Sequence, residues 1–272
     1  SRIQNYVTTA AWTYFPSPKH TVDFGASNTY YVFSPGKITG AFDITLSQEW
    51  ATEPAAYVSH TWKATNAFSV TSGLRYSAFG NMGPRTVTLY EPGGIYEDTT
   101  VVGTRSYARG EAIRWFTGLG GLEPRFSANY EISENASLKA SYNRNRQYIH
   151  LISNNTSPTP VNVWRPAGAY IEPATANQVA LGYVQKVARG AGVLTIETYY
   201  KDLQNIVDYK DGADLVFKDN IETELLSGQG RAYGLEVLLE KKTGKLNGWI
   251  AYTLSRTELQ VDGPTRGTSV NN

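Results

Sequence analysis

Apolar and polar residues alternate along most of the chain. In residues 68–78, apolar side chains occupy most even positions, whereas Ser, Thr, Gly and Arg occupy the odd ones. The same pattern recurs in residues 125–132, 194–201 and 233–240. A period of two puts alternate side chains on opposite faces of a β-strand. The pattern therefore predicts strands with one apolar, aromatic face and one polar face, and no sustained helical spacing competes with it.

Ten segments carry this strand pattern. Several are much longer than the five or six residues that are common in soluble strands. They are long enough for membrane-spanning strands, which need roughly nine to eleven residues. We expect the strands at residues 3–15, 20–33, 53–65, 68–80, 122–132, 137–152, 177–188, 193–206, 231–241 and 246–256.

Short and long connections alternate strictly between these segments. The first two strands are joined by a short polar turn at residues 16–19, and the third and fourth by Asn66-Ala67. Three more short turns follow, at residues 133–136, 189–192 and 242–245. Such turns close antiparallel hairpins. The four remaining connections are long and rich in Gly, Pro, Asn, Ser and Tyr.

This alternation predicts an antiparallel up-and-down meander with tight turns at one end and long loops at the other. Outer-membrane β-barrels have this asymmetry, with an apolar face toward lipid and a polar face toward the lumen. Aromatic residues near strand ends fit the interfacial girdles of such barrels. They are Trp12, Tyr14, Tyr30, Tyr31, Trp62, Tyr76, Tyr130, Tyr142, Tyr183, Tyr199, Tyr200, Trp249 and Tyr252.

Composition narrows the function classes. The 272 residues carry 25 Lys+Arg against 24 Asp+Glu, and this balance does not indicate a nucleic-acid partner. Cysteine is absent, which excludes disulfide scaffolds, Cys-ligated metals and thiol catalysis. No apolar run approaches the roughly twenty residues that a membrane-spanning helix needs.

Motifs along most of the chain resemble one known family. Gly-Leu-Glu-Pro-Arg at 121–125 and Gly-Arg-Ala-Tyr-Gly-Leu-Glu at 230–236 are the most specific. In order and spacing, the set resembles the barrel of TonB-dependent outer-membrane receptors of the Bacteroidota. The other matching stretches are residues 56–58, 73–77, 142–144, 147–148, 173–178, 181–183, 197–201, 248–249 and 252–256, together with Asn205.

The resemblance implies an all-β, antiparallel meander of about ten long strands that is part of a 22-stranded transmembrane barrel. Residues 1–272 would then be a partial barrel, with the plug domain and the remaining strands absent. It further implies a Gram-negative outer membrane and uptake of a scarce nutrient, such as a siderophore, vitamin, peptide or glycan. The implied partners are outer-membrane lipid, the nutrient and the TonB complex, reached through the missing N-terminal plug region. A surface lipoprotein is a further partner left open.

Two groups of residues are candidates for function. Aromatic and Arg side chains in the long loops concentrate binding energy where they cluster, so they are the candidates for ligand contact. They are Tyr90, Tyr96, Arg105, Tyr107, Trp115, Trp164, Arg165 and Tyr170. Charged side chains on the polar face of the strands are expected to face the lumen. They are Arg75, Arg125, Lys139, Glu197, Lys201, Glu236 and Glu240.

Catalytic and cofactor chemistry finds little support. Nucleophile and phosphate-loop motifs are absent, and Gly228-Gln229-Gly230 is interpreted as the exit of a loop. The spacing of the three histidines excludes common metal motifs, although a barrel could bring His60 and His150 together. Glu222 and Glu224 would share one strand face. Glycoside hydrolysis needs two such carboxylates in a cleft, but loop polarity explains this pair equally well. We expect no enzyme activity, cofactor or metal.

Two alternatives remain at this point. A soluble all-β binding or structural module would bury the apolar face in a core and would fold without detergent. A plugless porin or adhesin barrel would share the lipid-facing strands but would not be preceded by a plug.

Overall fold

The computed structural model consists mainly of β-strands. It describes residues 2–34, 37–38, 44–45, 48–92, 96–114, 120–152, 163–210, 213, 220–261 and 270–271. Within these ranges, the helical elements are three 3-10 turns: η1 (Asp98–Thr100), η2 (Ala188–Gly190) and η3 (Ile221–Glu224). None of the described helices is long and apolar enough to cross a membrane.

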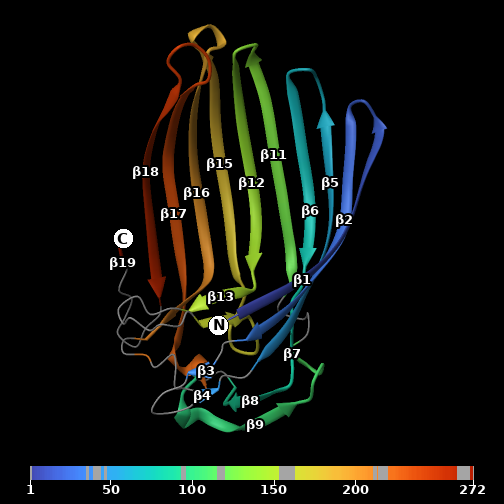
Figure 1. The fold of residues 1–272 in the computed structure, drawn as a ribbon, viewed down its shortest axis with the longest axis vertical. Helices are drawn as coiled ribbons and strands as arrows, with labels where there is room; N and C mark the ends of the chain where they lie inside the picture. The colour runs from blue at the N-terminus through green and yellow to red at the C-terminus, as the bar shows by residue number, and fades with distance from the viewer. Residues whose placement is uncertain are drawn as a thin grey trace.

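Ten long strands stand side by side and form one curved sheet (Figure 1). All ten strands expected from the alternation are present, which confirms the all-β prediction. They are β1 (Arg2–Ser17), β2 (His20–Ser34), β5 (Glu49–Lys63), β6 (Phe68–Ser77), β11 (Gly121–Ser133), β12 (Ala136–Gln147), β15 (Ala174–Val187), β16 (Gly192–Tyr209), β17 (Leu225–Lys241) and β18 (Gly248–Val261).

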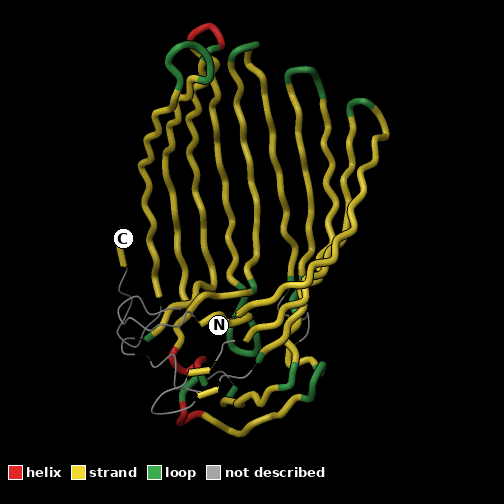
Figure 2. The backbone as a smooth tube through the Cα atoms, in the orientation of Figure 1, coloured by secondary structure: helices red, strands yellow, loops and turns green. Residues whose placement is uncertain are grey.

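Each long strand pairs antiparallel with the next long strand along the chain. The tight turns gather at one end of the sheet and the long connections at the other, as Figure 2 shows. The predicted meander and its sorted connections are therefore confirmed. In the described part of the chain no ladder joins β1 to β18, so the sheet is an open arc.

The long loops contain short strands that the alternation did not predict. The expected strand at 137–152 was too long: β12 ends at Gln147, whose Nε2 donates to the carbonyl of Ile149 (2.7 Å), and the chain turns into a separate hairpin. The short strands are β3 (Lys37–Ile38), β4 (Ile44–Thr45), β7 (Gly80–Met82), β8 (Arg85–Tyr90), β9 (Val101–Tyr107), β10 (Ala112–Arg114), β13 (Ile149–Ile152), β14 (Val163–Pro166) and β19 (Val270–Asn271).

The strand register gives the sheet two chemically different faces. On one face, here called the outer face, Leu138, Tyr183, Ile196, Val237 and Tyr252 form a row across five strands. The next row toward the loops continues with Ala140, Leu181, Thr198, Leu235 and Leu254. The opposite, inner face carries Ser, Thr, Asn, Gly and most of the charges of the long strands.

The outer face is exposed as well as apolar. Leu122, Leu181 and Leu254 have exposed fractions of 53%, 61% and 61%. On β16 the apolar rows run from Leu194 to Tyr200, six residue steps or roughly 20 Å at about 3.3 Å per residue. That height approaches the apolar band of about 25 Å on a membrane barrel, and a soluble monomer rarely exposes so large an apolar surface.

Most of the expected girdle aromatics lie on the outer face, but three do not. Tyr31, Tyr199 and Trp249 pair in register with inner-face positions, so they point to the other side of the sheet. The reason is parity, because in each of these places two aromatic or bulky residues are adjacent in sequence and only one can face outward.

Gly228 and Gly230 are inside strand β17, so their interpretation as a loop exit was wrong. A Cβ atom at Gly228 would lie 2.4 Å from the carbonyl oxygen of Gln260 on the neighbouring strand. Glycine in a strand often marks such a close approach of two backbones. The pairing of β17 with β18 therefore extends further toward the loops than the sequence pattern indicated.

Candidate functional site

A buried polar network lies on the inner face where the strands meet the long loops. Glu123 on β11 is 1% exposed and accepts a hydrogen bond from Ser77 Oγ on β6. Ser77 Oγ is also 2.7 Å from Tyr148 Oη, which comes from the loop after β12. The register places Arg75 directly opposite Glu123, and their charged groups are 3.8 Å apart. One buried carboxylate thus connects the wall of the sheet to a loop.

The network continues along the inner face to strand β5. Arg75 Nη2 lies 3.6 Å from Glu53 Oε1, and Tyr31 Oη donates to Glu53 Oε2 at 2.8 Å. Arg125 Nη2 lies 3.8 Å from Glu123 Oε2. Two arginines and two carboxylates therefore balance each other's charge, as buried charges require.

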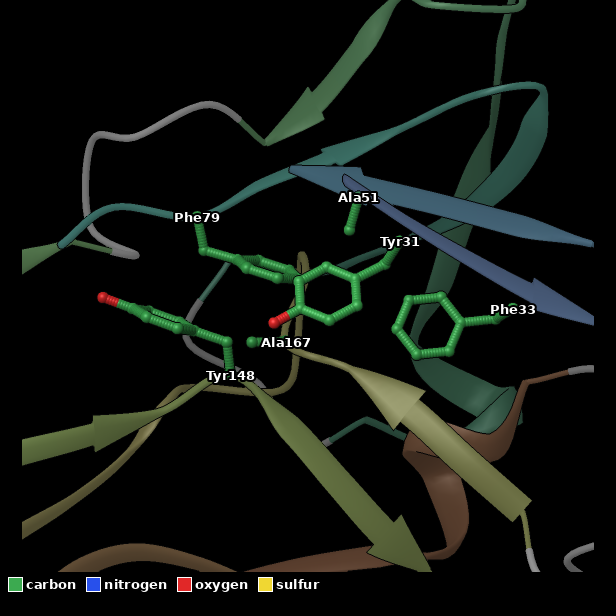
Figure 3. Close-up of a cluster of buried hydrophobic side chains, with 6 residues drawn as sticks. All are labelled: Tyr31, Phe33, Ala51, Phe79, Tyr148 and Ala167. Atoms are coloured by element: carbon green, nitrogen blue, oxygen red, sulfur yellow. The ribbon is translucent and has the colours of Figure 1, made fainter. Parts of the chain in front are cut away.

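Tyr31 and Tyr148 of this network also belong to a cluster of buried aromatic rings (Figure 3). Phe79 and Tyr148 stack with ring centroids 5.1 Å apart, and Tyr31 lies 6.4 Å from Phe79. Phe33, also in this cluster, is 2% exposed. The cluster packs residues of β2, of the segment after β6 and of the loop after β12 against one another. This packing fixes the position of both loops relative to the sheet.

A second buried carboxylate holds two different loops. Glu49, at the start of β5, is 4% exposed. Arg85 at the start of β8 lies 3.1 Å from it, and Arg165 on β14 pairs with its other oxygen. The β8–β9 hairpin and the β13–β14 hairpin are therefore both tied to one residue of the wall.

His150 lies opposite Arg165 in the β13–β14 ladder and is 6% exposed. Burial lowers the pKa of its imidazole, and a backbone hydrogen bond to Glu172 opposes that shift. Folding therefore disfavours the charged imidazole.

The lowered pKa predicts that acid loosens the β13–β14 hairpin. A histidine whose folded pKa is depressed contributes full stability above about 6.5 and loses it as pH falls below that value. We expect hydrogen exchange in β13 and β14, corrected for intrinsic rates, to be faster at pH 5.5 than at pH 7.5. The His150→Gln variant should lose this pH dependence, whereas His20→Gln, at the turn end, should keep it. An equal pH response in both variants would contradict the assignment.

Three tyrosines join the long loops to one another. Tyr90, Tyr96 and Tyr170 have ring centroids 4.7 to 5.4 Å apart. Tyr90 Oη donates to Glu222 Oε1 at 3.2 Å, and Tyr170 Oη donates to the carbonyl of Thr88 at 2.6 Å. Burial, followed by the nearby charge of Glu222, raises the pKa of both Tyr90 and Tyr170. At these spacings the rings pack on one another and leave no room for a ligand between them.

Removing one hydroxyl from this group should weaken the junction of the loops. In Tyr170→Phe the carbonyl of Thr88 loses its donor, which typically costs about 1 kcal/mol. We expect faster hydrogen exchange in β8 and η3 of the intact protein. Tyr107→Phe is the control, because its ring can still stack under Arg105 without the hydroxyl. If both variants exchange alike, the Tyr170 hydrogen bond does not hold the loops.

The structure brings together only some of the eight loop candidates. Tyr90, Tyr96 and Tyr170 form the aromatic group just described, whereas Arg165 is engaged by Glu49. Arg105 stacks over Tyr107, with its guanidinium carbon 4.8 Å from the ring centroid. Trp164 is 36% exposed, and Trp115 lies outside the described residues. The candidates thus mostly contact the protein itself, and Tyr96 and Trp164 keep the more exposed rings.

The register places all seven charged candidates of the strands on the inner face. Below the buried network this face is hollowed by small side chains into a recess of about 350 Å³. Lys139 and Glu197 border it, and Ser69, Thr71, Ser127, Ser141 and Gly182 line it. The seven are Arg75, Arg125, Lys139, Glu197, Lys201, Glu236 and Glu240.

The structure differs from the sequence interpretation at two groups of residues. His60 lies beside His20, with 2.9 Å between ring nitrogens, because β2 and β5 are neighbours, while His150 is in a loop hairpin. Glu222 and Glu224 belong to the 3-10 turn η3 and not to a strand. Within the described ranges, no three His, Cys, Asp or Glu side chains are placed to hold a metal.

Sequence reasoning missed the buried acids that organise the site. Glu49, Glu53 and Glu123 are not distinguished from surface acids by their local sequence. Glu123 is on the polar side of an alternating strand, and only its partners on β6 show that it is buried. A weak signal existed in Glu49 and Glu53, which lie on a strand that otherwise contains only one other charge, Lys63.

Comparison with known proteins agrees with this architecture. Residues 3–272 match the family described as TonB dependent receptor-like, beta-barrel. No curated protein matches the sequence.

Three solved structures of similar fold are longer than this chain. The FrpB iron transporter from Neisseria meningitidis aligns with a TM-score of 0.59 and 13% identity, over 99% of this chain and 38% of that one. The siderophore receptor PirA from Pseudomonas aeruginosa aligns with a TM-score of 0.57 and 13% identity, over 99% of this chain and 47% of that one. The copper transporter OprC aligns with a TM-score of 0.58 and 12% identity, over 96% of this chain and 41% of that one. The present chain spans less than half of each. From its strands, their order and the family match, the chain belongs to the TonB-dependent receptor β-barrel family.

Proposed function

We propose that the intact protein containing this chain is a TonB-dependent transporter of a Gram-negative outer membrane, and that the source is a member of the Bacteroidota. The observation that carries the proposal is the separation of faces on the long strands, apolar and exposed outside, polar and charged inside. In a membrane, lipid covers such an outer face, and the unpaired edges of the arc need further strands. This chain supplies one arc of the barrel wall and the loops above it.

The proposed cargo is a scarce nutrient such as a siderophore, vitamin, peptide or glycan. The three similar structures are named as an iron transporter, a siderophore receptor and a copper transporter, which favours metal-containing cargo among these. Ligand contact is assigned to the loop candidates, first to Tyr96 and Trp164 because their rings are exposed. No enzyme activity belongs to this proposal.

The inner face is proposed to hold a plug domain within the lumen of the complete barrel. Lys139 and Glu197 beside the recess offer one charge of each sign to such a domain. Arg125, Lys201, Glu236 and Glu240 would extend this contact surface around the wall. The TonB complex would act through the plug and not through this chain. A surface lipoprotein remains a further candidate partner.

The proposal is tested by uptake in the native host. A strain lacking the gene should lose uptake of one nutrient among radiolabelled ferric chelates, copper and cobalamin, and the intact gene should restore it. Removing TonB should abolish the restored uptake. Uptake that continues without TonB would favour a plugless pore, and a soluble protein of about 30 kDa in cell fractions would favour the free-standing β module.

A further inference from the structure

A row of charged and polar residues ends the apolar part of the outer face on the loop side. The register aligns Arg144, Asn177, Asp202, Arg231 and Glu258 across five neighbouring strands. The adjacent outer row, one step nearer the turns, contains Tyr142, Val179, Tyr200, Tyr233 and Arg256. The outer face therefore changes from apolar to charged within one step of the strand.

Two arginines in these rows share one carboxylate. Arg231 on β17 pairs through Nε with Glu258, and Arg256 Nε lies 2.6 Å from the other oxygen of Glu258. The side chain of Glu258 is 16% exposed, whereas those of Arg231 and Arg256 are 57% and 56% exposed. The carboxylate thus orients both guanidinium groups, and the three residues, here called the outer arginine site, keep a net charge of one positive.

Aromatic rings lie directly next to the outer arginine site. Tyr233 is opposite Arg256 in the β17–β18 ladder and opposite Tyr200 in the β16–β17 ladder. The two tyrosine rings stack at 6.5 Å between centroids, with an interplanar angle of 18°. Tyrosine at this level is typical of the boundary between acyl chains and headgroups. The arginines are then at headgroup depth, on the side of the sheet that faces lipid.

Phosphate is the anion that this arrangement fits. Guanidinium groups bind phosphate oxygens with paired hydrogen bonds, and Arg is preferred to Lys for such recognition. Because Arg231 and Arg256 point away from the lumen, nutrient inside the barrel cannot reach them. The accessible phosphates at this depth are those of lipid headgroups.

We propose that Arg231 and Arg256 bind the phosphate group of an anionic lipid in the leaflet on the loop side of the membrane. Glu258 positions the two guanidinium groups, and Tyr200 and Tyr233 pack against the first carbons of the lipid. The proposal rests on the proposed function only in that the outer face meets lipid. It is independent of the nutrient and of TonB.

The test measures lipid binding to the intact, detergent-purified protein by native mass spectrometry. Phosphatidylglycerol and phosphatidylcholine are titrated separately against wild type and Arg231→Gln/Arg256→Gln. Each arginine near an anionic lipid surface contributes about fivefold, so we expect the double variant to bind phosphatidylglycerol on the order of 20-fold more weakly. Phosphatidylcholine has the same phosphate diester but no net charge, so its affinity should fall by a smaller factor. Lys241→Gln, which removes an outer-face cation at the turn end of β17, is the matched control and should behave as wild type.

A second variant tests the charge argument without removing an arginine. Glu258→Gln raises the net charge of the site from one to two positives, so it should bind phosphatidylglycerol more tightly than wild type. Equal affinity of wild type and double variant, or of the two lipids for wild type, would overturn the proposal. Full competition by inorganic phosphate at equal concentration would also overturn it, because the site would then recognise free phosphate. A protein that imports its nutrient normally but fails these tests would leave the proposed function intact.

Discussion

Replacement of Glu49 by alanine is expected to release two loops at once. Glu49 is 4% exposed and holds Arg85 of one hairpin and Arg165 of another. In Glu49→Ala two neighbouring guanidinium groups lose their shared counter-charge, and breaking a buried pair in this way typically costs about 3–5 kcal/mol. The β8–β9 and β13–β14 hairpins should therefore open while the ten-stranded wall stays folded. Hydrogen exchange of the intact protein should increase in both hairpins and not in β15–β17.

Glu91→Ala is the matched control for this result. Glu91 lies at the end of the same β8–β9 hairpin but is exposed, so its loss should change stability by less than about 0.5 kcal/mol. If the hairpins of Glu49→Ala exchanged hydrogen as slowly as those of Glu91→Ala, the shared carboxylate would not be what holds the loops.

A charge on the outer face is expected to damage the protein far more than the same charge on the inner face. Val237 and Leu238 are neighbours on β17 and face opposite sides of the sheet. Val237→Arg should cost about 2–4 kcal/mol near the middle of a membrane, because the guanidinium then lies against lipid. Leu238→Arg should be nearly neutral, since it points to the side that carries Glu236 and Glu240. Urea unfolding in lipid vesicles measures both variants under the same conditions.

If Leu238→Arg cost more stability than Val237→Arg, the face here called inner would be the one that meets lipid. Similar costs for both variants would indicate that neither face meets lipid, as in the soluble alternative. The two substitutions are at adjacent positions of one strand and introduce the same residue, so strand propensity and depth in the membrane are nearly the same for both.

The strands were predictable because alternation is a local property of the sequence. Side chains two residues apart share a face whatever the partner strand is, so β6, β11 and β16 can be located without tertiary knowledge. The strictly alternating connection lengths then determined the order of the strands. The same reasoning failed at Tyr148, where a loop residue folds back onto the wall.

The buried acids could not be predicted because their roles depend on residues distant in sequence. Glu49 acts with Arg85 and Arg165, and Glu123 with Ser77 and Tyr148. Long loops lack the periodic patterns that report pairing, so neither their short strands nor their contacts are visible in sequence. Resemblance identified the family but gave no information about these contacts.

The loops and the wall are stabilised by different interactions. The wall depends on backbone ladders and on the surroundings of its outer face, whereas the loops depend on two buried carboxylates and a tyrosine group. Loops joined to one another through Tyr90, Tyr170 and Glu222 should respond together when one of them is displaced. These contacts link the β6–β11, β12–β15 and β16–β17 connections to one another.

The central claim, that the long strands separate lipid from lumen, is tested most directly by the environment of single residues along β17. The chain contains no cysteine, so one cysteine at a time can be introduced at positions 233–240 of the intact protein and spin-labelled. The account predicts that, in membranes, odd positions are accessible to oxygen and even positions to a water-soluble nickel chelate, or shielded from both by a plug. Uniform accessibility to the chelate at all eight positions would contradict it.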